Sequence, residues 1–421
     1  MRLLSPIVIT LLALGALACS PRIQSHFAGP GDLERAPEAP QARAMGLSPC
    51  GDYRGYSPDT LHLDHLPLKY LRVNVHFMNS SDSSRNFNYP EGVQKAEALL
   101  HAANHDIETN DKLYLPLGND LPALPPQYRL KLSPRPDDPD DTGVYFHYDD
   151  ELYYYVIKGK NDNRSKRKVI DTYGVQLDTV LNIFVMPHHP DSMASSTYRP
   201  SWAGIALGNG VKITGWFENK VTEWDLRYVL NHEIGHIFGL VHTWAYNDGC
   251  DDTPYHPKCW NFSDTPPCDS LVSNNVMDYN AYQSAWSPCQ IGKIQYIMSR
   301  EDQKSRRFLE PNWCEIHADR NIAVADSVHW QGARDLEGNL RILPGGYLKI
   351  SCRVSLPRHA KITVEPGGTL VLDACRLHNA CGDNWQGIEI RQNGVEKGKV
   401  VLIGVPVVED AENLFPVNGE R

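Results

Sequence analysis

The sequence lacks an excess of basic residues. Its 421 residues include 41 Lys and Arg against 51 Asp and Glu, which gives a formal net charge of -10. Because surfaces that bind nucleic acid are strongly basic, this balance argues against DNA or RNA as a partner. The hydrophobic content, 41%, is enough for a large core, and a chain of this length is expected to divide into two folded domains. The sequence does not indicate an oligomeric state.

Long apolar runs are also lacking, apart from one at residues 3–17. That run is too short to cross a bilayer comfortably, so it predicts a secretory signal peptide over residues 1–18. Ala16-Leu17-Ala18 satisfies the small-x-small rule of signal peptidase. Cys19 instead resembles the cysteine of a bacterial lipobox, although Ala16 stands where lipoproteins usually have Leu. We favour a lipoprotein. Either route predicts an extracytoplasmic protein, secreted or on the outer surface of a bacterium, that meets the membrane only through a lipid on Cys19.

Cysteine is scarce in the first half of the chain. Only Cys19 and Cys50 precede residue 250, and eight more follow. A total of ten cysteines fits an oxidising compartment. The eight later cysteines could form four disulfides, but spacing alone does not choose among the many possible connectivities.

One segment carries the chemistry, because residues 232–242 read HEIGHIFGLVH. His232 and His236 are four apart on a predicted helix, so they project from one face and can share a metal ion. A helix cannot also direct position 242 to that ion. Gly239 resolves this, because glycine tolerates the left-handed conformation that ends helices, and the chain can then turn back to make His242 the third ligand. The alternative, histidines scattered on a helix surface, is disfavoured by the completeness of the motif.

Three neutral imidazoles leave a tetrahedral Zn²⁺ ion with one open position, which is typical of a catalytic site. Zinc lowers the pKa of a water in that position from ~15.7 to roughly 7, and Glu233 can take its proton as the water attacks a carbonyl. Thr222 and Asp225 predict the N-terminal cap of this helix. An apolar stripe at helical spacing supports the helix: Leu226, Val229, Leu230, Ile234, Ile237 and Phe238.

Together with the downstream segment Asn275-Val276-Met277-Asp278-Tyr279, this motif resembles the metzincins, whose mark is a methionine turn beneath the metal. The resemblance implies an α+β catalytic domain with a twisted sheet, an active-site helix and that turn. It implies that Met277 packs under the three imidazoles and that Tyr279 swings toward the metal to stabilise the transition state. Taken alone, a Met in a short loop is usually core filler.

Within that clan the sequence is similar to the pappalysin-type proteases. The likeness spans residues 66–314 and is densest in the segments 204–206, 209–213, 239–244, 249–254 and 276–279. In this family the loop after the third histidine often binds calcium, which implies Asp251, Asp252 and Thr253 as ligands. Carboxylate and carbonyl oxygens suit calcium, but a D-D-T-P segment is at least as often a solvated turn.

Two further implications concern cysteines. The resemblance implies one disulfide that joins Cys250 to Cys268 and another that joins Cys259 to Cys289. Cys50 resembles the cysteine switch of latent metzincins, in which a propeptide thiolate occupies the fourth zinc position. The alternative is that Cys50 is paired elsewhere or left free.

The chain divides by pattern into segments. Residues 19–65 are rich in Pro, Gly and Ala without periodicity, which indicates a propeptide or linker. The protease domain is predicted over residues 66–314, with a strand at 70–77, a helix at 91–107 and a strand at 180–186. Residues 202–216 are expected to supply the edge strand that faces substrate, since an extended peptide can bind by adding a strand to a sheet.

Residues 315–421 have no long helical stripe and predict an all-β accessory domain. A near repeat, Pro344-Gly345-Gly346-Tyr347 and, 22 residues later, Pro366-Gly367-Gly368-Thr369, indicates the coils of a right-handed parallel β-solenoid. Cys352 and Cys375 take nearly equivalent places in the repeat, which predicts a bridge across coils. A β-sandwich is the alternative. The coil-like pattern continues to the end of the sequence, so either the last coil caps itself or the solenoid is incomplete.

Two classes of function follow. The first is a secreted or lipid-anchored zinc endopeptidase that hydrolyses peptide bonds of a protein or peptide substrate, with Glu233 as general base and latency through Cys50. The second is a non-catalytic cell-surface adhesin or binding module that uses the β domain. Degenerate protease scaffolds usually lose a metal ligand or the glutamate, and neither is missing here, which favours the enzyme.

Overall fold

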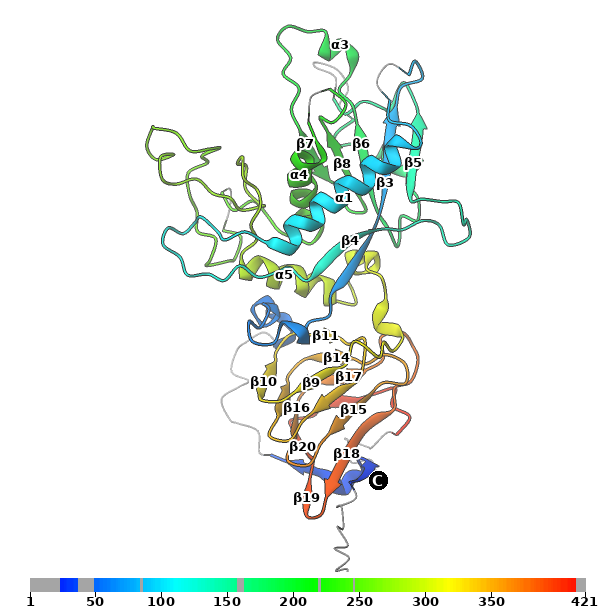
Figure 1. Cartoon of the computed structure of the whole chain (residues 1–421), viewed down its shortest axis with the longest axis vertical. Coiled ribbons are helices and arrows are strands. Elements are labelled where there is room, and N and C mark those ends of the chain that lie inside the picture. The colour runs from blue at the N-terminus through cyan, green and yellow to red at the C-terminus, as the bar shows by residue number, and fades with distance from the viewer. Residues whose placement is uncertain are drawn as a thin grey trace, which may run out of the picture.

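The computed structural model describes residues 23–36, 49–83, 86–156, 163–218, 221–244 and 247–413. The molecule has two parts, an upper part that holds the α-helices and one sheet, and a lower part built of β-strands (Figure 1). The predicted signal peptide and Cys19 lie outside the described residues. None of the helices within those ranges combines the length and the apolar character that a membrane span requires.

A six-stranded sheet organises the upper part. Its order is β4-β3-β6-β8-β7, with β5 beside the second half of β3. Every pair is parallel except β7 and β8, which run antiparallel at the edge. The bounds are β3 Lys69–Asn79, β4 Tyr128–Leu132, β5 Val144–Tyr148, β6 Leu181–Met186, β7 Ala203–Ala206 and β8 Gly210–Thr214.

The predicted strands at 70–77 and 180–186 are confirmed as β3 and β6. The stretch 202–216 is a hairpin of β7 and β8 rather than one strand. Gly208, whose φ is +77°, lies in the turn between them, in a backbone region that favours glycine. The hairpin leaves β7 as the edge strand.

Apolar side chains on one face of the sheet form the core with two helices, α1 (Glu91–Thr109) and α4 (Glu223–Ile237). Leu71, Val73, Val75 and Phe77 alternate along β3 and are completely buried in this core. Burial of each such side chain contributes roughly 1.5–3 kcal/mol relative to exposure. The helix predicted at 91–107 is confirmed as α1. The other helices are α2 Lys168–Tyr173, α3 Pro190–Met193 and α5 Pro288–Ser299.

The lower part consists of three sheets whose strands repeat in the same order along the chain. The first sheet holds β9 Ile322–Val324, β12 Leu340–Ile342, β15 Lys361–Val364 and β18 Gly387–Asn393. The second sheet holds β10 Ser327–Trp330, β13 Tyr347–Ile350, β16 Thr369–Asp373 and β20 Lys399–Ile403. The third sheet holds β11 Arg334–Asp335, β14 Arg353–Ser355, β17 Arg376–His378 and β21 Val407–Val408. Each of these strands pairs in parallel with its counterpart in the next repeat. Tyr347 lies opposite Thr369, so the 22-residue sequence repeat is the repeat of the ladder. A short strand, β19 (Glu396–Lys397), folds back on β18.

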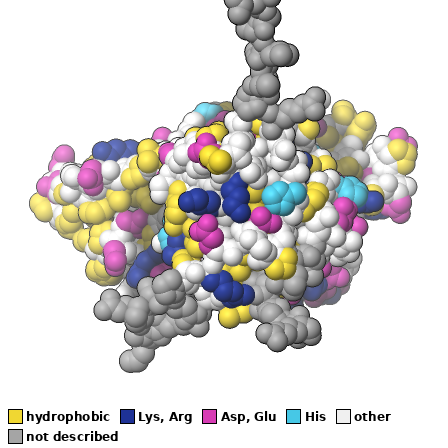
Figure 2. Space-filling model, turned by 90° about the horizontal axis from the view of Figure 1, so that it is seen from below, with side chains coloured by type: hydrophobic (Ala, Val, Ile, Leu, Met, Phe, Trp, Pro, Cys, Tyr) yellow, Lys and Arg dark blue, Asp and Glu magenta, His cyan; other side chains and the backbone are white. Residues whose placement is uncertain are grey.

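Residues 19–65, predicted as a propeptide or linker from their lack of periodicity, contain regular strands in their first described stretch. Strand β1 (Gln24–Phe27) pairs antiparallel with β18, and β2 (Leu33–Arg35) pairs parallel with β20, so the blue N-terminal strands lie beside the red C-terminal ones (Figure 1). These strands satisfy backbone groups at two sheet edges. Because the pairing uses main-chain groups and β1 is largely exposed, no apolar alternation marked it in the sequence. Seen from below, this end of the molecule carries scattered charged side chains of both signs (Figure 2).

Short 3-10 turns occupy much of the remaining connecting chain: η1 Pro30–Asp32, η2 Pro49–Gly51, η3 Tyr53–Tyr56, η4 Leu63–His65, η5 Lys304–Phe308 and η6 Asn312–Cys314. The turns η2 to η4 connect the lower part to β3. The first of them is tied to the lower part by a disulfide between Cys50 and Cys352.

The disulfides differ from every pairing that was predicted. Cys250 pairs with Cys289, and Cys259 pairs with Cys268. The family resemblance had implied Cys250 with Cys268 and Cys259 with Cys289. The backbone N–H of Cys289 donates to Asp252 at 2.9 Å, which holds it beside the loop of Cys250. A fourth bridge joins Cys314 to Cys381, across the two parts.

The predicted bridge across coils between Cys352 and Cys375 is also wrong. Cys352 packs with Tyr56 and Ala333 on the side that faces the N-terminal segment, whereas Cys375 packs inside the core of the lower part and is a free thiol. The side chains of Cys352 and Cys375 therefore point in different directions, although the two residues hold nearly equivalent positions in the repeat. Burial raises the pKa of the Cys375 thiol to about 12.

A buried carboxylate joins the two parts. Asp335 of β11 accepts hydrogen bonds from Arg306 of η5 at 2.6 and 3.0 Å and from Arg353 of β14 at 2.7 Å. The same arginines donate to the carbonyls of Met298 and Ser299, at the end of α5, at 2.9 and 2.8 Å. Cations at a helix C-terminus are favourable, so one ionic cluster fixes α5 and η5 of the upper part against the lower part.

We expect Asp335→Asn to lower the free energy of unfolding by about 3–5 kcal/mol, because it leaves two buried guanidinium groups without their carboxylate. Although burial alone would raise it, the pKa of Asp335 is held well below its usual range by Arg353 and Arg306. A depressed folded-state pKa stabilises the fold above the unfolded pKa of about 4, and the contribution is lost as the pH falls below that value. Urea unfolding near neutral pH and at about pH 3 measures both effects. As a control, Asp319→Asn at the exposed Asp319–Arg320 pair should change stability by less than about 1 kcal/mol; equal effects of the two substitutions would contradict the buried cluster.

The Cys50–Cys352 bridge generates a second prediction. Replacement of both residues by Ala should lower the free energy of unfolding by roughly 2–4 kcal/mol, because the bridge restricts the unfolded chain. A double variant that is as stable as the parent chain would contradict this structural role.

Candidate active site

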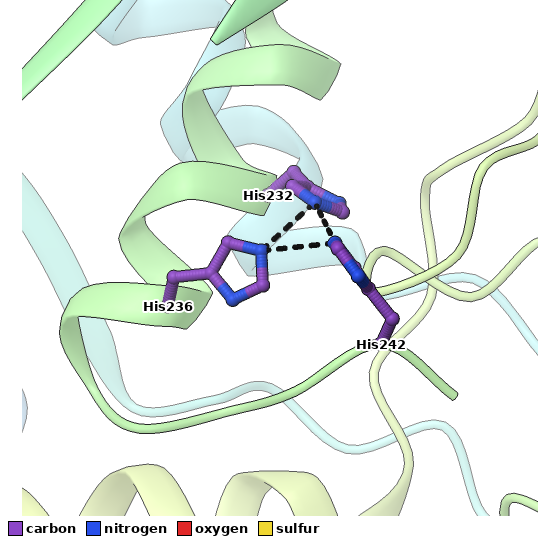
Figure 3. Close-up of side chains that lie close together, drawn as sticks. All are labelled: His232, His236 and His242. Carbon is purple, nitrogen blue, oxygen red and sulfur yellow. Dashed lines mark hydrogen bonds between the residues drawn. The ribbon is translucent and has the colours of Figure 1, made fainter. Parts of the chain in front are cut away.

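Helix α4 places the first two histidines. Its N-terminus is capped as the sequence predicted, with the Thr222 N–H donating to the Asp225 carboxylate at 2.8 Å. Leu226, Leu230 and Ile234 are completely buried and orient the helix against the sheet. His232 and His236 therefore leave one side of α4, one turn apart (Figure 3).

The turn after α4 brings in the third histidine. Gly239 has a φ of +80°, the left-handed conformation that the motif required, and the Leu240 N–H then returns to the Gly235 carbonyl at 3.0 Å. The reversed chain carries His242 back toward the helix. The three ring nitrogens meet, with Nε2–Nε2 distances of 3.1 to 3.2 Å (Figure 3).

The donor set fits zinc. A tetrahedral ion with Zn–N bonds of ~2.0–2.1 Å requires nitrogens about 3.3 Å apart, close to the observed spacing. Nδ1 of His232 donates to the Val276 carbonyl at 2.6 Å, and Nδ1 of His236 donates to the Leu240 carbonyl at 2.8 Å. Because Nδ1 carries the proton in both rings, Nε2 has an unshared electron pair, and this is the form of imidazole that binds metal. Burial lowers the pKa of His232 to about 3 and that of His242 to about 4, and it lowers the pKa of His236 as well, so all three rings are neutral at neutral pH.

Glu233 lies beside the histidine cluster and is buried. Burial raises the pKa of Glu233 to about 8, and a hydrogen bond from the Ala206 backbone opposes this rise. A group with a pKa near neutrality can both accept and return a proton. A nearby cation would lower the pKa of this carboxyl and favour the base form.

Gly204 of β7 makes room for Glu233. A Cβ at position 204 would lie 2.6 Å from Glu233 Cγ and 2.8 Å from its Oε1. The edge strand β7 and the Glu233 carboxylate are thus in direct contact. They can approach this closely only because position 204 has no side chain.

The methionine turn lies beneath the cluster. Met277 is completely buried, and its sulfur lies so close to Gly235 of α4 that a Cβ there would overlap it. The Thr243 N–H donates to the Met277 carbonyl at 3.3 Å, which ties the turn to the segment of His242. Met277 thus packs against the helix that carries His232 and His236, and its packing under the three imidazoles stays a prediction.

Tyr279 stands on the open side of the cluster. Its ring centroid lies 4.7 Å from that of His242 and 5.7 Å from that of His232. The ring is partly exposed and borders a cleft of about 580 Å³ whose other lining residues include Trp202, Gly204, Glu233 and Trp260. The cleft therefore lies between the edge strand and the methionine turn.

The predicted calcium ligands do not converge. Asp251 is exposed, Asp252 accepts from the Cys289 N–H, and the Thr253 hydroxyl donates to Asp248 at 2.7 Å. The ammonium of Lys293 donates to the Asp248 carbonyl and already supplies positive charge to this loop. Calcium at this place stays a prediction.

The prediction that Cys50 keeps the site latent by binding the metal is wrong. The Cys50 sulfur is bonded to Cys352 of the lower part, so it has no thiolate to offer a metal. The residues around Cys50 give no signal of its partner, which lies 302 positions further along the chain.

Two contributors to the site were missed. Gln283 donates through Nε2 to the carbonyls of Asp278 and Val276, the latter at 3.3 Å, and so stiffens the methionine turn. Lys258 places its ammonium 4.2 Å from the Trp244 ring and 4.4 Å from the Tyr279 ring. No sequence pattern marked either residue, because Gln283 bonds to main-chain carbonyls and Lys258 contacts rings of two separate segments.

Comparisons with known proteins agree with this geometry. Residues 204–305 match the model of the reprolysin-like metallopeptidases of family M12B. This stretch is thus similar to a metallopeptidase domain. It contains every histidine of the cluster, Glu233, Met277 and Tyr279.

Solved structures give weaker likenesses. Mature mirolysin of Tannerella forsythia in complex with a cleaved peptide shares 18% identity with a TM-score of 0.41, over 57% of this chain and 94% of that one. Mirolysin in complex with compound 9 shares 18% identity with a TM-score of 0.40, over 57% and 96%. A promirolysin mutant of Tannerella forsythia shares 17% identity with a TM-score of 0.41, over 57% and 84%. No curated protein matches the chain.

The contact at position 204 yields a test. Gly204→Ala should lower kcat/KM for a peptide by about 10- to 100-fold, because the new methyl group displaces the Glu233 carboxylate, while bound zinc and the melting temperature change little. Activity assays with parallel metal analysis measure this. Gly31→Ala, where no atom lies within 4 Å of the added carbon, is the control. Equal activity of the two variants would show that Glu233 tolerates displacement.

Proposed function

We propose that the chain is a zinc-dependent endopeptidase of the pappalysin-like type that hydrolyses peptide bonds of protein or peptide substrates outside the cytoplasm. The observation that carries this proposal is the convergence of three neutral imidazole nitrogens beside a buried Glu233, at the floor of a cleft bordered by an edge strand.

His232, His236 and His242 would hold the metal through Nε2. A zinc ion bound there supplies Lewis acidity, which lowers the pKa of water and polarises the substrate carbonyl. Glu233 accepts the proton of the attacking water and delivers it to the amine that leaves. The phenol of Tyr279, on the open side of the site, donates to the oxyanion that develops on the substrate.

Strand β7 positions the substrate. Among the described strands, its only partner is β8, so its outer backbone groups can pair with an extended peptide. The exposed side chains of Trp202 and Trp260 form apolar walls of the same cleft. A peptide that pairs with β7 passes directly over Glu233, because Gly204 touches that carboxylate.

We also infer that residues 315–413, the described part of the accessory region, form a right-handed parallel β-solenoid. The support is the in-register parallel pairing of strands within each of the three sheets, and the filling of the interior between the sheets by residues such as Leu348, Ile350, Leu370 and Leu372. A solenoid places the same side-chain type at the same point of successive coils, as these leucines and isoleucines illustrate.

We further propose secretion or a lipid anchor on Cys19, in a bacterium. The four disulfides support this, because such bonds persist in oxidising compartments.

A binding module without catalysis is the second candidate. It would use the lower part and would have no need for a neutral histidine cluster next to a carboxyl group of raised pKa. The geometry of the cleft therefore favours the peptidase.

Glu233→Ala separates the two functions. We expect this substitution to lower the rate of casein or quenched-peptide cleavage by at least about 10³-fold, since the general base is removed, while the metal stays bound. Chelation of the metal should abolish cleavage by the parent protein. Glu97→Ala, an exposed change on α1, should leave the rate unchanged. Full activity in Glu233→Ala with zinc present would rule out the proposed mechanism.

A further inference from the structure

A second cavity lies where the N-terminal turns meet the lower part, and the peptidase mechanism does not use it. Its volume is about 270 Å³. Its lining comes from η3 and η4 on one side and from strands β10 and β11, with the connection between them, on the other. Most of its polar side chains are hydrogen-bond donors or cations, among them Arg54, His62, His65, Gln331 and Arg334.

Arg334 is the unusual member. Its side chain lines the cavity although the residue is only 7% exposed, and its Nε has no hydrogen-bond partner. Among the ion pairs within the described ranges, none includes Arg334. The guanidinium lies 5.6 Å from the Trp330 ring, which offers a π-face but no oxygen or nitrogen lone pair to accept an N–H bond. Burial lowers the pKa of Arg334 to about 10, so the group is still charged at neutral pH.

A buried guanidinium without an acceptor is costly and is rare in folded proteins. Asp59 is the nearby carboxylate, but its two oxygens are already engaged, one by His62 at 2.7 Å and the other by the Leu61 N–H at 3.0 Å. His62 is held between Asp59 and Asp326, 3.0 Å away on its other side, and these carboxylates raise its pKa. His62 thus bonds to both carboxylates, whereas Asp59 acts on Arg334 through its charge alone, since no hydrogen bond joins these two side chains.

A second residue that lines the cavity also has a polar atom without a partner. His65 is 2% exposed, and its Nδ1 makes no hydrogen bond. Protonation would make this nitrogen a donor, and an anion in the cavity would favour that form. Three residues that line this small space, His65, Trp330 and Arg334, therefore each have a buried nitrogen without a hydrogen-bond partner, and the exposed cation of Arg54 lies beside them.

We propose that this cavity is a binding site for an oxyanion group, in the form of a sulfate, held chiefly by the Arg334 guanidinium with Arg54 at the entrance. Arginine presents its donors in a planar fork that matches two oxygens of such a group. The site is separate from the zinc cluster and is built from two segments that are far apart in the chain. Its ligand is therefore also a link between the N-terminal turns and the lower part.

Equilibrium dialysis of the full chain with radiolabelled sulfate tests the site at constant ionic strength. We expect saturable binding of one sulfate per chain. Arg334→Met keeps the apolar volume and removes the charge, and Arg54→Gln changes an exposed side chain; each should weaken binding at least tenfold. Arg320→Gln, at an exposed arginine outside the cavity, should bind sulfate as the parent does.

Stability in chloride gives an independent readout. Because Arg334 has no acceptor, Arg334→Met should melt at the same or a higher temperature than the parent in chloride and should lose the extra stabilisation by sulfate. Sulfate stabilises proteins generally, so the difference between parent and variant is the quantity to compare. If Arg334→Met does not fold, Arg54→Gln decides the question through dialysis.

The source of the sulfate group is distinguished by competition with N-acetylglucosamine 6-sulfate and with unsulfated N-acetylglucosamine. Displacement by the sulfated sugar at lower concentration than by free sulfate assigns the cavity to a sulfated glycan, and the reverse order assigns it to the free ion. The absence of saturable binding, or equal binding by the parent and Arg54→Gln, would overturn the proposal.

Discussion

Three neutral imidazole nitrogens directed at one point are the constraint on which the active-site region depends. Without a cation their lone pairs repel one another, so the surrounding structure must hold them together. Gly239 reverses the chain, the carbonyls of Val276 and Leu240 fix two of the rings, and Met277 supports the helix from beneath. Each of these features is explained by the need to present three nitrogens to one ion.

The lower part is joined to this framework at several points. The Asp335 cluster binds the end of α5, and the Cys314–Cys381 bridge crosses between the parts. The chain begins its described course in the lower part, at β1 and β2, and enters the upper part through η2 to η4. The lower part is thus held firmly against the upper part, since a buried ionic cluster and a covalent bridge both fix their contact.

The parts of this molecule that the sequence predicted share one property, which is that their determinants are local. The helix at α4, the turn at Gly239, the strands β3 and β6 and the 22-residue repeat each depend on residues close together in the chain. A single motif was enough for the metal ligands because its spacing encodes a helix face followed by a reversal. Met277 and Tyr279 followed from the family resemblance.

The remaining features depend on partners far apart in the chain. Cys50 and Cys352 are separated by 302 positions, and no local pattern joins them. Strand β1 pairs through its backbone, which leaves no alternation of apolar residues to detect. The disulfides were wrongly paired because equivalence in a repeat, or in a family, does not determine the direction in which a side chain points. Arg334 could not be recognised as a buried charge until η3 and η4 were placed against β11.

Zinc X-ray absorption spectroscopy of the purified protein tests the central claim most directly. The account predicts one zinc ion per chain with three imidazole nitrogens and one oxygen at ~2.0–2.1 Å, and no sulfur. A sulfur ligand at ~2.3 Å, or a six-coordinate ion with oxygen ligands only, would contradict it.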